Sequence, residues 1–234
     1  MPKLTTIGFD ADDTLWHNER FFRMTQDRFA DLLRDYCEAD HLMERLLEAE
    51  KRNISHYGFG IKGFVLSMIE TALDVTGDRV PGPVIRALVD AGQEMLQHPI
   101  ELLPHAQEAV EAIADTHRVL LITKGDLLDQ ERKLAQSGLG ELFDGVEVVS
   151  EKTPEVYHDI FARHGDGAKH AMMVGNSMRS DVGPALEAGW RAIHVPPPTE
   201  WAHDMADGTE LARFKRANGF RDVAELVQCA DFWG

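Results

Sequence analysis

Acidic residues follow a short apolar segment near the N-terminus, in the sequence TTIGFDADDTLW of residues 5–16. Residues 6–9 have the pattern of a buried strand, and Asp10, Asp12 and Asp13 come in the loop that follows it. Asp10 and Asp12 are two residues apart, so their carboxylates project to the same side if the chain stays extended. Because close carboxylates repel each other, either a cation binds there or one acid keeps its proton.

A purely structural explanation of this segment is also open. Asp and Thr are common in turns and at helix N-termini, so Asp13 or Thr14 could begin the helix that follows. An EF-hand calcium loop is disfavoured, because its glycine is missing and Phe21 occupies the place of the bidentate Glu. The choice between chemistry and capping therefore depends on the rest of the chain.

The composition limits the classes of protein to consider. The chain has 234 residues, enough for one substantial domain or for a core domain that carries a smaller one. Its 44% hydrophobic content is typical of a folded protein. The formal net charge of -16 disfavours binding to nucleic acid or to an anionic membrane, and an anionic substrate would need local cations.

The cysteines and the apolar segments bear on localisation. Cys37 and Cys229 are far apart and lack metal-site spacing, which fits a reducing compartment. The N-terminus does not have the basic and apolar pattern of a signal peptide, and no segment is apolar for the length of a membrane span. We expect a soluble, cytoplasmic protein.

Residues 17–103 show helical spacing of apolar residues, repeated about four times, with no convincing strand. Their aromatic and methionine residues are most simply the core of a helical bundle. Within this region, residues 51–64 gather Arg52, His56, Tyr57 and Lys62 around three glycines. This segment is either a solvated helix connection or a loop that contacts substrate.

From Pro104 onward, strand patterns alternate with single helices. The expected strands are residues 118–123, 146–149, 170–174 and 190–195. Such alternation predicts right-handed crossovers and a parallel sheet, and therefore an α/β fold. In such a sheet Asp10, Thr123, Lys152 and Asp181 lie near one edge, where ligands bind.

Four motifs occur in order: DADDT at Asp10, ITKG at Thr123, Lys152, and GNSMRSD ending at Asp181. Together they resemble the four motifs of the haloacid dehalogenase-like hydrolase superfamily, over residues 5–13 and 104–195. The resemblance implies a Rossmann-like parallel sheet flanked by helices, formed by residues 1–16 and 104–234. Residues 17–103 are then an inserted α-helical cap domain.

The resemblance also implies roles for individual residues. Asp10 would be the nucleophile that forms an aspartyl phosphate, and Asp12 would protonate the leaving oxygen and later deprotonate water. Lys152 would neutralise charge between nucleophile and phosphate. The expected phosphate contacts are Thr123, Lys124, Gly125 and Lys152.

A magnesium site is implied as well. Mg²⁺ would take a carboxylate oxygen of Asp10, the carbonyl of Asp12, and Asp181 directly or through water. Most phosphatases of the family have an acid where this chain has Asn176, whose amide brings no charge but can bond a metal-bound water. Asn176 and the neighbouring Ser177 are therefore expected to support the ligands, although Ser177 could equally contact phosphate or cap a helix.

These implications predict a Mg²⁺-dependent phosphomonoester hydrolase that acts on a small phosphorylated metabolite. Asp12 favours this reaction over dehalogenation, because a halide leaves without a proton and the dehalogenase branch lacks the second acid. The alternatives are a phosphonatase, a haloacid dehalogenase, a phosphomutase, or a catalytically weakened protein that binds a phosphorylated ligand. Nucleic acid and membrane are not expected as partners, and the sequence indicates no oligomeric state.

Overall fold

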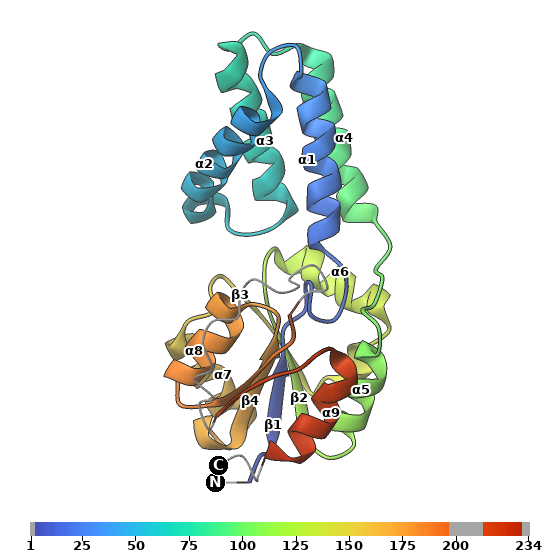
Figure 1. The fold of residues 1–234 in the computed structure, drawn as a ribbon, viewed down its shortest axis with the longest axis vertical. Helices are drawn as coiled ribbons and strands as arrows, with labels where there is room; N and C mark the ends of the chain where they lie inside the picture. Colours follow the sequence, from blue (N-terminus) through green and yellow to red (C-terminus); the bar gives the residue numbers. More distant parts are fainter. Residues whose placement is uncertain (1–2, 197–212, 231–234) are drawn as a thin grey trace. The chain divides into compact units, whose positions relative to one another are not determined.

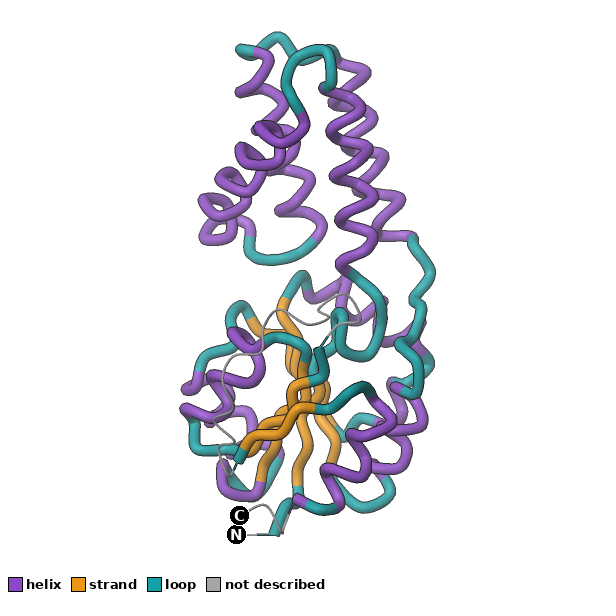
Figure 2. The backbone as a smooth tube through the Cα atoms, in the orientation of Figure 1, coloured by secondary structure: helices purple, strands orange, loops and turns teal. Residues whose placement is uncertain are grey.

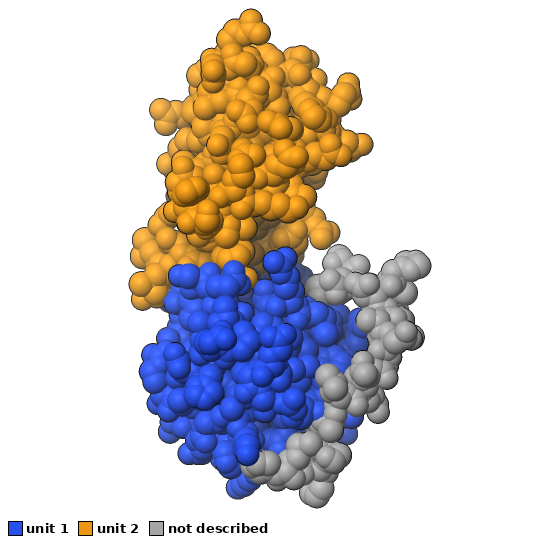
Figure 3. Space-filling model, turned by 90° about the vertical axis from the view of Figure 1, so that its left-hand side faces the viewer, with its two compact units in different colours: residues 1–17, 100–123, 132–234 blue, residues 18–99, 124–131 orange. Residues whose placement is uncertain are grey.

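The computed structural model describes residues 3–196 and 213–230. It divides into two compact units, coloured separately in Figure 3. The first comprises residues 1–17, 100–123 and 132–234, and the second comprises residues 18–99 and 124–131. The second unit thus begins one residue later and ends four residues earlier than the predicted cap domain, and it includes a segment that the prediction gave to the core. Trp201 and Trp233 lie outside the described residues.

Within the described residues of the first unit, six strands form one parallel sheet, which confirms the predicted α/β fold. Their order across the sheet is β3-β2-β1-β4-β5-β6, so β1 is central. The strands are β1 (Thr6–Phe9), β2 (Arg118–Lys124), β3 (Gly145–Val149), β4 (Ala171–Gly175), β5 (Arg191–His194) and β6 (Phe214–Arg216). The sequence did not predict β6, because three residues with two cations have no strand pattern of their own.

Helices cover both faces of this sheet, as Figures 1 and 2 show. On one face lie α5 (Ala106–Ala114) and α9 (Phe220–Gln228), and on the other lie α7 (Pro154–His164) and α8 (Gly183–Glu187). A π-helical turn, Met178–Val182, leads into α8. The remaining helix, α6 (Leu127–Ser137), follows β2 and has its last residues in the first unit.

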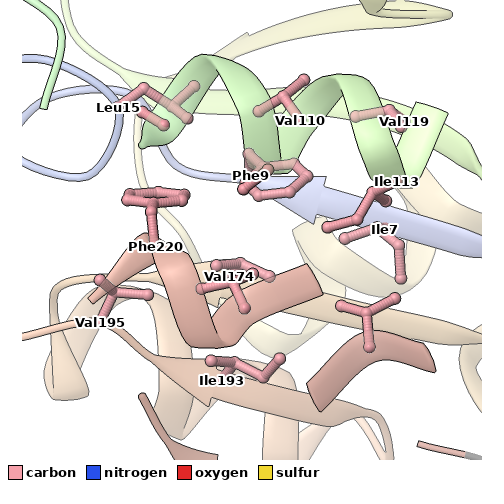
Figure 4. Close-up of a cluster of buried hydrophobic side chains, with 14 of the residues drawn as sticks. Ile7, Phe9, Leu15, Val110, Ile113, Val119, Val174, Ile193, Val195 and Phe220 are labelled. Atoms are coloured by element: carbon pink, nitrogen blue, oxygen red, sulfur yellow. The ribbon is translucent and has the colours of Figure 1, made fainter. Parts of the chain in front are cut away.

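β1 lies between two apolar cores. Ile7 and Phe9 are fully buried on the α5 and α9 side, where the ring centroids of Phe9 and Phe220 are 6.5 Å apart (Figure 4). Gly8 faces the other core, and a Cβ there would lie 2.9 Å from Phe161 Cζ. The strand that carries the acidic loop is therefore packed tightly on both sides.

The second unit is built from helices, as predicted. Its residues 18–99 form α1 (Glu19–Leu33), α2 (Ala39–Tyr57), α3 (Ile61–Thr76) and α4 (Gly82–Gln97). Phe29, Phe64 and Met68 are buried in a shared apolar core, as the pattern predicted, whereas Tyr36 is 48% exposed. Among the helices of the described ranges, none is both long and apolar enough to cross a membrane.

Replacing Phe220 with alanine should lower the free energy of unfolding by about 3–5 kcal/mol, because it leaves a cavity against Phe9. Urea unfolding followed by far-UV circular dichroism measures this change. Gln228→Ala, at an exposed position of the same helix, is the control and should change stability by less than about 0.5 kcal/mol. Equal effects of the two substitutions would show that the α9 core contact contributes little.

Candidate active site

The carboxyl ends of three neighbouring strands bring the motif residues together. Phe9 of β1 lies beside Leu121 of β2 and Val174 of β4 in register. Asp10 after β1, Thr123 near the end of β2 and Gly175 at the end of β4 therefore lie at the same edge of the sheet. This is the convergence that the alternation of strands and helices predicted.

The loop after β1 turns back on itself and does not begin a helix. The Leu15 amide donates to the Ala11 carbonyl at 2.8 Å, and Asp13 takes a left-handed conformation with φ of 59°. Helix α1 begins only at Glu19, after Asn18. The capping explanation for Thr14 is therefore wrong, because its hydroxyl instead donates to Asp10 Oδ2 at 2.7 Å.

A buried chain of charges, Asp10–Lys152–Asp181, forms the centre of the site. Lys152 Nζ donates to Asp10 Oδ1 and, at 2.7 Å, to Asp181 Oδ1. The three side chains are at most 10% exposed. One ammonium thus lies between two carboxylates from different loops, and contact of Lys152 with phosphate stays a prediction.

This arrangement shifts the pKa values of its members. Burial and then the charge of Asp181 raise the pKa of Asp10 to about 6, against the opposing effect of Lys152. Burial disfavours the Lys152 ammonium, but the two carboxylates outweigh it and raise the pKa of Lys152. Burial, followed by the charges of Asp181 and Asp10, raises the pKa of Tyr157 well above its ordinary value. The Tyr157 hydroxyl therefore stays protonated beside Asp181, 3.5 Å from Oδ1.

The loop after β4 orients Asp181 through its backbone. The Ser177 amide donates to Asp181 Oδ2 at 2.9 Å, and the Ser177 hydroxyl accepts from the Ser180 amide at 3.0 Å. Ser177 is therefore a cap of the π-helical turn, one of the roles considered for it. Gly175 is required by packing, because a Cβ there would collide with the carboxylate of Asp181.

Asn176 is linked to Asp10 through Thr14. Its amide nitrogen in the backbone donates to Thr14 Oγ1 at 3.0 Å, and its side-chain oxygen lies 3.1 Å from the same hydroxyl. His194 Nε2 lies 2.8 Å from the Asn176 carbonyl, so this nitrogen carries the proton. The neutral residue at position 176 thus fixes the Thr14 hydroxyl that contacts Asp10.

Asp12 has a separate environment. Lys133 Nζ donates to both of its carboxylate oxygens, at 2.9 and 3.0 Å, and Trp16 Nε1 donates to Oδ1 at 2.8 Å. Asp10, by contrast, shares the ammonium of Lys152 with Asp181. Proximity of the Asp10 and Asp12 carboxylates stays a prediction.

Sequence reasoning missed four of these contacts. Thr14 is four residues after Asp10, a spacing that could have suggested the contact if the loop were known to be a helical turn. Trp16 follows Asp12 at the same spacing and bonds it in the same turn. Lys133 and Tyr157 carry no such signal, because the partner of each lies on a distant segment. In particular, a lysine on α6 would ordinarily be assigned to solvent.

The last residue of β2, Lys124, and the next residue, Gly125, are two of the predicted phosphate contacts. Lys124 lies over the Phe59 ring, with Nζ 4.0 Å from the centroid, and Gly125 takes a φ of 138° that favours glycine. Both residues belong to the second unit, whereas Thr123, which is 1% exposed, belongs to the first. Contact of Thr123, Lys124 and Gly125 with phosphate stays a prediction.

The four residues proposed as a substrate loop make separate contacts. Lys62 pairs with Asp126 at 2.8 Å, and Arg52 approaches Glu70 at 3.8 Å. The ring centroids of His56 and Tyr57 are 6.3 Å apart, and Tyr57 is 54% exposed. The two cations thus face acids within the second unit, and their contact with a substrate stays a prediction.

The donor atoms of the site fit Mg²⁺. No group of three or more His, Cys, Asp or Glu side chains suited to a metal ion occurs in residues 3–196 and 213–230. Mg²⁺ needs fewer, because it is commonly held by one or two carboxylates with water and substrate oxygens. Asp10 and Asp181 supply two carboxylates, and with Lys152 they leave one negative charge uncompensated.

Comparison with known proteins places this fold and site in a family. The model of the haloacid dehalogenase-like hydrolases matches residues 4–189. A haloacid dehalogenase-like family hydrolase from Xanthomonas campestris is 39% identical, with a TM-score of 0.88 over 98% of this chain and 92% of that one. The chain therefore belongs to the haloacid dehalogenase-like hydrolases. No curated protein matches it.

More distant structures share the fold. A HAD-hydrolase from Bacillus subtilis bound to magnesium is 14% identical, with a TM-score of 0.67 over 97% of this chain and 99% of that chain. The L-2-haloacid dehalogenase from Xanthobacter autotrophicus, with chloropropionic acid covalently bound, is 17% identical, with a TM-score of 0.65 over 96% and 98% of the two chains. At these identities the likeness extends to the fold alone.

The raised pKa of Asp10 gives a prediction for stability in metal-free protein. A carboxyl whose folded pKa is about 6 binds its proton more tightly in the folded than in the unfolded chain. Its contribution to stability is full below the unfolded pKa and is lost as pH rises through the folded pKa. The stability of the native protein relative to Asp10→Asn should therefore fall between about pH 4 and pH 7.

Urea unfolding in the presence of a chelator, at several pH values across this range, measures the difference between the two proteins. Asp159→Asn is the control, because the Asp159 side chain is 78% exposed, and its difference from the native protein should stay nearly constant. The burial argument for Asp10 fails if the difference in unfolding free energy between Asp10→Asn and the native protein is likewise constant across this pH range.

Proposed function

We propose that this hydrolase is a Mg²⁺-dependent phosphomonoesterase that acts on a small phosphorylated metabolite through an aspartyl phosphate on Asp10. The observation that carries the proposal is the division of labour between two acids. Asp10 is buried against Lys152, whereas the Asp12 side chain is 22% exposed and has its own partners, Lys133 and Trp16. A nucleophile and a proton donor need such different environments.

The nucleophilic step follows from the position of Asp10. Lys152 and the Thr14 hydroxyl each bond one of its carboxylate oxygens, so rotation of the carboxylate is restricted. An oxygen of this carboxylate attacks phosphorus, and the phosphorus–oxygen bond to the leaving group breaks. Lys152 offsets the repulsion between a carboxylate and an anionic phosphate, which is the main electrostatic obstacle to this reaction.

The proton steps are assigned to Asp12. Its carboxyl gives a proton to the departing ester oxygen, and the resulting carboxylate takes a proton from the water that attacks the aspartyl phosphate. A positioned acid contributes about 10²- to 10⁴-fold to such a step. Mg²⁺, held by Asp10, Asp181 and the Asp12 carbonyl, would supply further neutralisation of the phosphoryl charge.

A haloacid dehalogenase is the second candidate, and the structural neighbours of that name are its support. Attack by Asp10 on carbon would serve that reaction too. A halide, however, leaves without a proton, so a second acid oriented by two donors has no task in that step. Asp12 therefore favours the phosphatase. A weakened, ligand-binding protein has only the neutral Asn176 in its favour.

Phosphate release tests the proposal directly. The native protein, with Mg²⁺, should release phosphate from p-nitrophenyl phosphate and from members of a panel of phosphorylated metabolites. Chelator should remove this activity, and Asp10→Asn should reduce it by at least about 10³-fold, because an amide cannot replace the carboxylate that forms the proposed intermediate. Chloride release from 2-chloropropionate is measured in parallel.

Asp159→Asn controls for loss of an acid elsewhere and should retain native activity, because its side chain is 78% exposed. Chloride release without phosphate release would replace the phosphatase by the dehalogenase. A folded native protein with neither activity would favour the ligand-binding alternative, and a full-rate Asp10→Asn variant would remove Asp10 as nucleophile.

Asn176→Asp should tighten Mg²⁺ binding by about tenfold, or about 1.4 kcal/mol. The side chain at position 176 contacts the Thr14 hydroxyl, which also bonds Asp10. A carboxylate there adds negative charge close to Asp10, and this charge attracts the cation. The Mg²⁺ concentration that gives half-maximal phosphate release measures the change. An unchanged concentration would show that position 176 has no influence on the metal.

A further inference from the structure

Lys133 is a buried lysine whose chemistry the four motifs do not include. It lies on α6, and its side chain is 6% exposed. Its ammonium is 2.9 and 3.0 Å from the two oxygens of Asp12. Burying a lysine is costly unless its charge is paired, so this contact must compensate for the loss of water. The pairing involves the acid that the proposed reaction uses for proton transfer.

A second donor makes the orientation of Asp12 specific. Trp16 Nε1 donates to Asp12 Oδ1 at 2.8 Å, from an indole that is fully buried. The Trp16 carbonyl accepts from the Asp13 amide at 2.8 Å, and Trp16 also bridges to Leu102. Trp16 is thus held by the turn that carries Asp12 and by Leu102, which follows the helical insertion in the sequence.

The three hydrogen bonds together define the plane of the carboxylate. Lys133 contacts both oxygens, which limits rotation about the bond to the carboxyl carbon. Trp16 bonds only Oδ1, so the two oxygens have different surroundings. A side chain that is 22% exposed at a tight turn would otherwise sample several rotamers. Proton transfer requires the acid within hydrogen-bond distance of its target, so sampling of other rotamers would slow it.

We propose that Lys133, assisted by Trp16, is a positioning residue that holds Asp12 in the orientation for proton transfer to the leaving group. The inference rests on the proposed phosphatase function. Lys152 and Lys133 then serve different steps, since Lys152 acts at the nucleophile and Lys133 acts through the acid. Loss of Lys133 should therefore matter in proportion to how strongly the leaving group needs a proton.

Three aryl phosphates of similar shape test this dependence in the full-length protein with Mg²⁺: phenyl, p-nitrophenyl and 2,4-dinitrophenyl phosphate. The value of kcat/KM reports formation of the aspartyl phosphate, where the leaving group departs. Lys133→Met should lower kcat/KM by about 10- to 100-fold for phenyl phosphate. For 2,4-dinitrophenyl phosphate, which leaves readily as an anion, the loss should be within about twofold.

Matched variants separate positioning from general damage. Trp16→Phe keeps an aromatic ring but removes the Nε1 donor, so it should show the same trend with a smaller loss. Lys133→Arg keeps a cation and should restore part of the activity toward phenyl phosphate. Asp12→Asn combined with Lys133→Met should be no slower than Asp12→Asn alone, because both act on one group. Lys169→Met, at an exposed lysine, is the control.

Each outcome has a definite meaning. An equal loss for all three substrates, or additive losses in the double variant, overturns the role of Lys133 while the phosphatase proposal stands. If Lys133→Met does not fold, the Trp16→Phe series decides in the same way. Absence of phosphate release by the native protein overturns the proposed function and this inference with it.

Discussion

The ion pair network of Lys152 with Asp10 and Asp181 is the constraint on which the rest of the site depends. Three charged groups are buried together, and two of them have the same sign. Removing such groups from water is unfavourable unless each is paired and hydrogen-bonded. The loops after β1, β3 and β4 must therefore hold their side chains at fixed positions, and most local features described above serve that purpose.

The sheet supplies the required rigidity. β1 lies between β2 and β4, its Ile7 and Phe9 pack into one apolar core, and residues of the other core lie close against Gly8. Its last residues cannot shift without opening a cavity on one face or a clash on the other. Burial and the charge of Asp181 therefore keep the pKa of Asp10 raised. Asp12, two residues later, lies in a more exposed environment. Two residues of one loop thus acquire different chemistry.

The sequence was sufficient for the features that depend on local pattern. Alternating apolar segments defined the parallel sheet, and the ends of its strands predicted that Asp10, Lys152 and Asp181 would meet. It was insufficient where a contact depends on tertiary packing. On α6, Asp129, Gln130 and Lys133 are all buried, although an amphipathic pattern assigns such polar residues to solvent. Similarly, β6 pairs because β5 offers an open edge, and its own residues give no strand pattern.

Gly175 shows how a charge can restrict a position that the backbone leaves free. Its φ is not in the left-handed region, so conformation alone would admit alanine. The obstacle is the Asp181 carboxylate, which occupies the volume of the missing side chain while it pairs with Lys152. Among proteins that share this network, residues 175 and 181 should therefore vary together in evolution. A side chain at position 175 becomes acceptable only once the acid at position 181 has been lost or moved.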